Sequence, residues 1–288
     1  MGVAMGESTR RMSRAEMDEI DSSFFATSLL SMGRSMSTAN VIMQLANPAV
    51  GYGVARSKVE NGRLDKHPVK RARTTASYLA VAVFGNADDR RRFRQAVSRQ
   101  HVQVRSDSDS PVTYDAMNVD LQLWVAACLY AGWEDIYERV HGPLTGQDRE
   151  TFYQQGKVCG TTLQMPAECW PQDRDAFGQY WDEQSMLISI SDEVREFLLG
   201  IANFDYAHPA IKRRYGPVKY GRTIGYLPQP FREAMRVSWT EEDQEWFDGY
   251  VAGLVAAERK KPLWLSQLGF RLLLWDVRVR CRLGRPLV

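Results

Sequence analysis

The chain has 288 residues, of which 44% are hydrophobic and 11% aromatic, enough to bury the core of one sizeable domain. Its 37 basic and 35 acidic residues nearly cancel, and the basic clusters form no nucleic-acid-binding motif, so nucleic acid is not an expected partner. No apolar run approaches the roughly 20 residues that cross a bilayer, and we expect no membrane span.

The cysteines and the N-terminus bear on the compartment. Cys128, Cys159, Cys169 and Cys281 are scattered without CxxC or metal-ligand spacing, which predicts reduced thiols. The first apolar run of the chain, Phe24 to Met32, is short and follows acidic residues, unlike a secretion signal. Both observations predict a cytoplasmic protein.

The chain is expected to hold a flexible, polar leader over residues 1–20 and a single domain over 21–288. Helical patterns recur through the domain and convincing strand alternation is absent, so the sequence predicts an all-α protein. The aromatic, Pro- and Gly-containing stretch 203–228 is expected to be an ordered loop. The segments predicted to be helical are 21–31, 36–46, 47–57, 66–84, 88–104, 114–140, 146–163, 171–183, 191–202, 229–236, 240–256 and 262–280.

The helix over 66–84 carries polar residues on a face that leads into the core. Arg71, Thr75, Tyr78 and Ala82 follow one another at spacings of four, three and four, so they share this face. A structural role is open: Arg71 could cap a helix or pair with a carboxylate, and Thr75 could bond to its own helix. A functional role is equally open on these residues alone.

The helix over 88–104 places a histidine on its apolar face. Phe93, Val97, His101 and Val104 form one stripe along the helix, and the arginines between them are expected on the other faces. The imidazole of His101 is therefore expected to point inward and to need a partner. That partner could be a backbone carbonyl or a buried hydroxyl, the usual arrangement, or a metal ion.

The helix over 262–280 is followed by a basic tail that contains Arg282 and Arg285. Three roles are open for this segment: packing on the domain, packing on a partner, or contact with an anionic surface.

In the order and spacing of several segments, the chain resembles the bacterial latex-clearing proteins, or rubber oxygenases, and their MpaB-type relatives from about Ala39 to about Met235. The resemblance implies an all-helical fold with a globin-like core that encloses haem b, and His101 as the proximal iron ligand. It also implies that Arg71 and Thr75 act on the other face of the haem, with Thr74 and Trp124 as further cofactor contacts. The segments that carry the resemblance are Gln44 to Val54, Arg71-x-x-x-Thr75 with Phe84-Gly85, His101-Val102-Gln103-Val104, Tyr114…Asp120…Leu123-Trp124-Val125, and Leu227-Pro228…Phe231-Arg232-Glu233.

The chain departs from the rubber oxygenases at two positions that matter for chemistry. Thr74 stands where those proteins carry a lysine that serves as a second axial ligand, so we expect the sixth iron position to be open or filled otherwise. The distal glutamate of the family would fall near Ala55 to Ser57, where this chain has Arg56 and no acid. The reaction is therefore expected to have diverged.

The leading functional hypothesis is a haem-b-dependent oxidative enzyme that acts on a hydrophobic small molecule with dioxygen or peroxide, in a biosynthetic tailoring step for example. A redox-neutral rearrangement or dehydration is an alternative. A haem- or lipid-binding protein without turnover, and a helical scaffold in which His101 bonds a carbonyl, are alternatives from other classes. If Arg71 and Thr75 face the cofactor, catalysis is favoured over simple binding.

Overall fold

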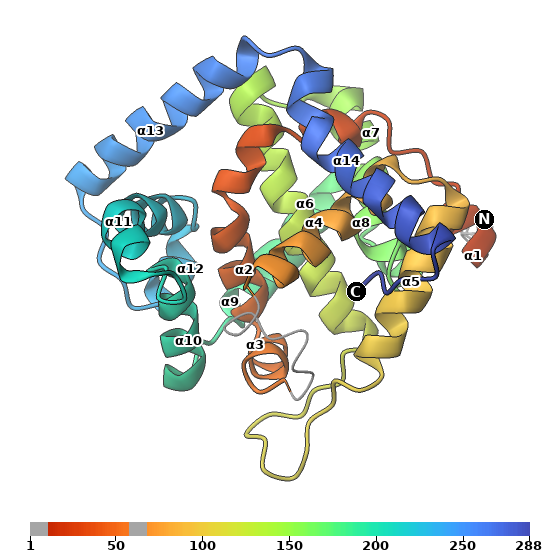
Figure 1. The fold of residues 1–288 in the computed structure, drawn as a ribbon, viewed down its shortest axis with the longest axis horizontal. Coiled ribbons are helices and arrows are strands. Elements are labelled where there is room, and N and C mark those ends of the chain that lie inside the picture. The colour runs from red at the N-terminus through yellow and green to blue at the C-terminus, as the bar shows by residue number, and fades with distance from the viewer. Residues whose placement is uncertain (1–10, 58–67) are drawn as a thin grey trace, which may run out of the picture.

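The computed structural model describes residues 11–57 and 68–288. These residues form an all-α protein, as predicted, and their one strand-like pairing is an isolated antiparallel bridge between Arg105 and Asp115. Figure 1 shows the helices gathered around α2, α4 and α6. The helices are α1 (Arg14–Asp18), α2 (Ser37–Leu45), α3 (Pro48–Ala55), α4 (Pro68–Phe84), α5 (Ala87–His101), α6 (Val119–His141), α7 (Gly146–Gly156), α8 (Val158–Thr161), α9 (Arg174–Met186), α10 (Asp192–Ala202), α11 (Pro209–Gly225), α12 (Gln229–Ala234), α13 (Glu241–Arg259) and α14 (Leu263–Arg282), with 3-10 turns at Phe25–Ser28, Ser31–Ser35 and Ala167–Cys169.

The core is built around α6. Asn118 caps this helix by accepting hydrogen bonds from two backbone N–H groups of its first turn. Tyr130, at mid-helix, is fully buried and packs edge-to-face on Phe177 with ring centroids 4.9 Å apart. Its hydroxyl donates to Glu134 at 2.6 Å, and Arg174 of α9 pairs with both oxygens of the same carboxylate. The buried carboxylate of Glu134 is thereby neutralised, as a charge in the core requires.

Two arginines of α5 are placed differently from the prediction. Asn86 caps the helix, close to the predicted start, but the expectation that all its arginines lie on outer faces is wrong for Arg90 and Arg94. Arg90 is only 4% exposed and donates to the carbonyl oxygen of Asp18, while Arg94 forms an ion pair with the buried Asp18 carboxylate. These acceptors come from residues before the domain core, so the pattern within α5 could not reveal them.

The predicted leader is only partly within the described residues, because residues 1–10 lie outside them. Residues 14–18 form α1, in which Ser13 and Glu16 make a capping box and Met17 is buried. α1 packs against α5 and α8. The segment 21–31, predicted to be an α-helix, instead holds one short 3-10 turn, Phe25–Ser28, and a second one, Ser31–Ser35, begins at its last residue.

The prediction of a loop over 203–228 is wrong, because residues 209–225 form α11. Pro209 occupies the first turn, where its missing N–H costs nothing, and the His208 side chain accepts a hydrogen bond from the backbone of Ala210. Gly225 lies directly against the ring of Phe247, and a Cβ there would come within 2.2 Å of that ring. Gly221, whose Cβ would come within 2.7 Å of Trp246, and Gly225 therefore allow close packing of α11 on α13.

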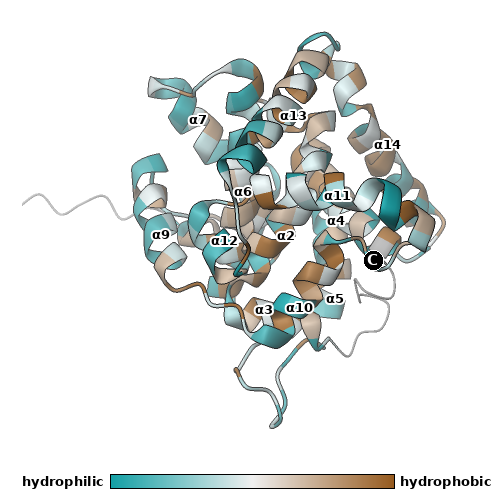
Figure 2. Ribbon diagram, turned by 90° about the vertical axis from the view of Figure 1, so that its left-hand side faces the viewer, coloured by the Kyte–Doolittle hydropathy of each residue, from teal (hydrophilic) through white to brown (hydrophobic). Residues whose placement is uncertain are grey.

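The C-terminal helices close over the core. Thr240 and Asp243 form the predicted capping box at the start of α13, and α14 packs along α4. Figure 2 shows hydrophobic segments on the central α2 and hydrophilic ones on α7 and α9 at the edge. Among the described residues, no helix is long and apolar enough to cross a membrane.

Candidate functional site

His101 is the last residue of α5, three residues earlier than the predicted helix end, and its side chain is half-buried. Its Nδ1 atom is buried and has no hydrogen-bond partner among the residues that the structure describes. Burial and the nearby Arg71 guanidinium lower the pKa of His101 to about 4, although a hydrogen bond with the Gln164 side chain raises it in part. The imidazole is therefore neutral at pH 7, the form that can bind a metal ion.

Arg71 comes from α4 and lies close enough to His101 to depress its pKa. The Arg71 side chain is half-buried, and burial lowers its own pKa as well. The described residues include no ion pair or hydrogen bond of the Arg71 side chain, and residues 58–67, which precede α4, lie outside them. A half-buried guanidinium is costly unless an anionic or polar group reaches it, so Arg71 is a candidate ligand-binding residue.

The two threonines of α4 differ in what their hydroxyls do. Thr74 donates to the carbonyl oxygen of Lys70 at 3.0 Å, within its own helix, so its hydroxyl is already used. Thr75 is half-buried and follows Arg71 by one turn, on the same face. The structure thus brings Arg71 and His101 together and leaves Thr75 on the helix face that Arg71 occupies.

A polar network behind His101 was missed by sequence reasoning. The side chain of Gln164 donates to the hydroxyl of Ser98, one turn before His101, at 2.6 Å. Gln122 of α6 donates to the Gln164 side chain at 2.9 Å and accepts from the Gln164 backbone N–H. Gln164 is thereby fixed beside the imidazole, as neighbours of a ligand histidine commonly are. Its position in a loop after α8 gives no periodic signal, so the sequence could not single it out.

Trp124, the fifth predicted site residue, lies deep in the core. Its indole N–H donates to the carbonyl of Gln44 in α2 at 3.0 Å, and its ring stacks on Trp181 and Phe231 at centroid distances of 5.6 and 6.3 Å. The void beside it measures only about 10 Å³. Within the described part of the chain, no hydrogen bond or ring contact joins the Trp124 side chain to His101 or Arg71, and its role as a cofactor contact stays a prediction.

Arg56 stands where the sequence comparison with rubber oxygenases leads one to look for an acid. The structure supplies one from another helix: Glu193 of α10 accepts two hydrogen bonds from the Arg56 guanidinium, at 2.8 and 2.7 Å. This pairing lowers the pKa of Glu193, so the carboxylate stays ionised and is a weak base.

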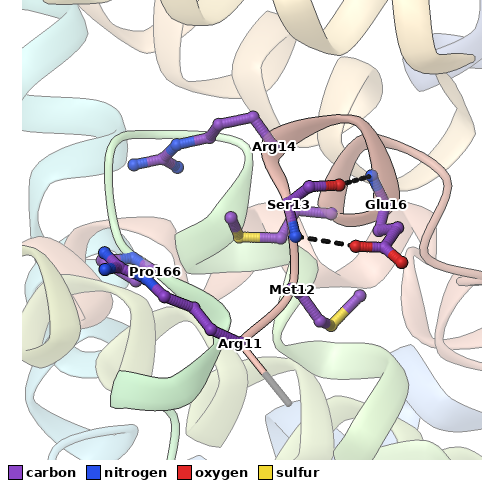
Figure 3. Close-up of a pocket in the computed structure, with 7 residues that line it drawn as sticks. Arg11, Met12, Ser13, Arg14, Glu16 and Pro166 are labelled. Atoms are coloured by element: carbon purple, nitrogen blue, oxygen red, sulfur yellow. Dashed lines mark hydrogen bonds between the residues drawn. The ribbon is translucent and has the colours of Figure 1, made fainter.

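A cavity of about 570 Å³ lies at the N-terminal end of the described chain, between residues 11–17 and Pro166 (Figure 3). Arg14, which lines it, donates to the carbonyl oxygens of Gln164 and Met165. Figure 3 shows Ser13 and Glu16 bonded to each other at its wall. The residues that line this cavity do not include His101, Arg71 or Thr75, so it is separate from the candidate site.

Comparisons with known proteins identify the family of the chain and its class of enzyme. The family described as the catalytic domain of the ER-bound oxygenase mpaB/B′ and rubber oxygenase matches residues 28–256, a longer stretch than the sequence segments alone indicated. An uncharacterized protein of Mycobacterium tuberculosis and another of Mycobacterium bovis are each 44% identical to the chain over 250 residues, which cover 87% of this chain and 98% of theirs. The search of solved structures found no match.

Proposed function

The chain belongs to the family of mpaB and rubber oxygenase catalytic domains and is an oxygenase-like enzyme, and on this premise we propose that it uses haem b to oxidise a hydrophobic small molecule. A single observation carries the cofactor assignment. The neutral His101 imidazole has a buried nitrogen for which the described residues offer no partner, and it lies beside the guanidinium of Arg71, an arrangement that favours a ligand.

The residues present fit haem b. His101 would bind the iron through a ring nitrogen, and Gln164 would hold the ring in its orientation. Arg71 would pair with a carboxylate of the cofactor or donate hydrogen bonds to the oxidant, and Thr75 would add a hydroxyl on the same face. When bound, the haem supplies the activation of dioxygen or peroxide, while the protein supplies orientation and electrostatics.

Two features of the chain shape the chemistry we propose. The hydroxyl of Thr74 is committed to its own helix, so it would not hold the iron in the way proposed for the lysine of rubber oxygenases. Glu193 is held ionised by Arg56 and does not serve as a proton-transferring base. Oxygen insertion or desaturation therefore fits this chain better than a mechanism that begins with proton abstraction by a distal carboxylate.

A hydrophobic substrate is proposed because the family description includes rubber oxygenases, whose named substrate is a hydrocarbon polymer. The position of Arg71 beside His101 favours an enzyme over a haem-binding protein without turnover, because it places a cation where it could act on the reacting groups. A redox-neutral haem enzyme remains the competing proposal, and the labelling experiment below separates the two.

The experiment is a mass-spectrometric assay with isotopically labelled dioxygen and a panel of apolar alkenes and terpenoids. We expect the wild type to give a product that carries label, which indicates oxygen insertion, or to consume dioxygen and give an unlabelled product with one more double bond, which indicates desaturation. Arg71→Met should lower turnover about tenfold or more while the Soret band is retained, because the guanidinium acts on the reacting groups. Arg99→Met, which removes an exposed arginine of α5, is the matched control and should leave turnover unchanged. A product without label and without dioxygen uptake, or full turnover by Arg71→Met, would overturn the proposal.

A further inference from the structure

The outer face of α14 is apolar although it faces solvent. The inner face is buried through Phe270, Leu274 and Val277 where the helix packs on α4. The opposite face carries large side chains that remain exposed, namely Trp264 (62%), Leu265 (43%), Leu268 (40%), Leu272 (56%) and Trp275 (65%). A surface helix normally turns polar residues outward, so α14 has one apolar face more than the fold needs.

The exposed residues form a continuous stripe. Trp264, Leu268, Leu272 and Trp275 follow at spacings of four, four and three, which places them on one side of the helix. The two tryptophans stand at the ends of the stripe, about 16 Å apart along the axis. In Figure 1 α14 lies on the outside of the molecule, across α4, and the exposed fractions of these side chains show that the described chain leaves the stripe uncovered.

The surroundings of the stripe are strongly basic. Residues 259–288 contain eight lysines and arginines and a single acid, Asp276, whereas the rest of the chain has more acids than bases. Three of the eight are in ion pairs, Arg280 with Asp276, Lys261 with Glu258 and Arg278 with Asp89, and the other five form no ion pair among the described residues. Exposed basic side chains at both ends of the stripe include Lys260 and Arg282.

We propose that α14 is an interfacial helix that docks this protein on an anionic lipid surface, with the Trp and Leu stripe in the outer acyl region and the basic residues at the headgroups. An apolar stripe with terminal tryptophans and basic flanks is the pattern of helices that lie in the plane of a membrane. No helix among the described residues could cross a bilayer, so docking is in the plane. A second copy of the chain fits less well, because pairing two such helices would bring their basic flanks together.

This proposal is independent of the haem site, since α14 lies outside residues 28–256 that match the oxygenase family. It commits the C-terminal helix to one of the three roles that the sequence left open.

The test is co-sedimentation of the full chain with vesicles of phosphatidylcholine containing about one third phosphatidylglycerol, and with vesicles of phosphatidylcholine alone. We expect binding to the anionic vesicles, weakened by salt, and little binding to the neutral ones. Trp264→Ser with Trp275→Ser should weaken binding about tenfold or more. Arg282→Ser with Arg285→Ser should weaken it by about fivefold for each charge removed.

Matched controls remove equal numbers of similar groups elsewhere. Met186→Ser with Leu187→Ser removes two highly exposed apolar side chains at the end of α9, and Arg213→Ser with Arg214→Ser removes two exposed charges of α11. Both should bind vesicles as the wild type does. All substituted side chains are exposed, and equal unfolding temperatures confirm that the fold is kept. No binding to anionic vesicles, equal binding by the α14 variants, or a wild-type dimer that the tryptophan variant converts to monomers would overturn the proposal.

Discussion

The carboxylate of Glu258 joins the last two helices to the core, and replacing it measures how much this junction contributes to the free energy of unfolding. The residue is 4% exposed, at the end of α13. It accepts hydrogen bonds from the hydroxyl of Ser31 at 2.7 Å, from the backbone N–H of Met32 at 3.2 Å and from the hydroxyl of Ser266 in α14, and Lys261 lies 3.3 Å away. Burial alone would raise the pKa of Glu258, but these hydrogen bonds and the charge of Lys261 outweigh it and lower the pKa.

Glu258→Gln keeps the shape and removes the charge. Hydrogen bonds to a charged group are about twice as strong as neutral ones, so the change should cost about 2 to 3 kcal/mol in the free energy of unfolding at pH 7. For a chain of this length, that corresponds to a fall of about 3 to 5 °C in unfolding temperature. Because the folded-state pKa is lowered, the stabilisation is present above the ordinary pKa of glutamate and is lost as the pH falls through the folded-state value.

The assay is thermal and urea unfolding of both proteins from neutral to acidic pH. The difference in unfolding free energy between wild type and Glu258→Gln should become smaller on acidification, because the wild-type carboxylate then also becomes neutral. Glu193→Gln is the matched control: its ion pair with Arg56 is exposed, so the loss should stay below about 1 kcal/mol. Equal unfolding temperatures of wild type and Glu258→Gln at pH 7, or a gap that persists at acidic pH, would refute the reasoning.

Two further predictions concern packing and are checked by the same unfolding measurements. Arg94→Leu leaves the buried Asp18 carboxylate without its cation and should destabilise the protein by about 3 to 5 kcal/mol, with partial recovery in the double variant that adds Asp18→Asn; no recovery would contradict the pairing. Gly33→Ala places a Cβ 2.2 Å from the Trp133 ring and should cost about 1 to 3 kcal/mol. Gly249→Ala, which meets nothing within 4 Å in α13, should instead stabilise by about 0.5 to 1 kcal/mol, and the same sign for both glycines would show that the packing is misjudged.

Helices with regular patterns and local caps could be predicted from the sequence, because the signals lie within a few residues. The capping box of Thr240 and Asp243 and the inward direction of His101 are of this kind. The family expectation is likewise confirmed, by a match over residues 28–256.

Features that depend on distant partners could not be predicted. Arg90 is buried because carbonyl groups before the core receive its guanidinium, and α11 forms because its glycines admit side chains of α13. Gln164 reaches His101 from a loop after α8, with no periodic pattern to announce it. In each case the deciding contact joins segments far apart in the chain. The globin-like character of the core stays a prediction.

The most direct test of the central claim is the visible absorption spectrum of the protein expressed with a haem precursor, beside His101→Ala and His141→Ala. His141 is an exposed histidine at the end of α6 and serves as the matched control. We predict a Soret band near roughly 400 nm that persists in His141→Ala and collapses in His101→Ala, with both variants folded by thermal unfolding. A colourless wild type, or a band unaffected by the loss of His101, would contradict the account.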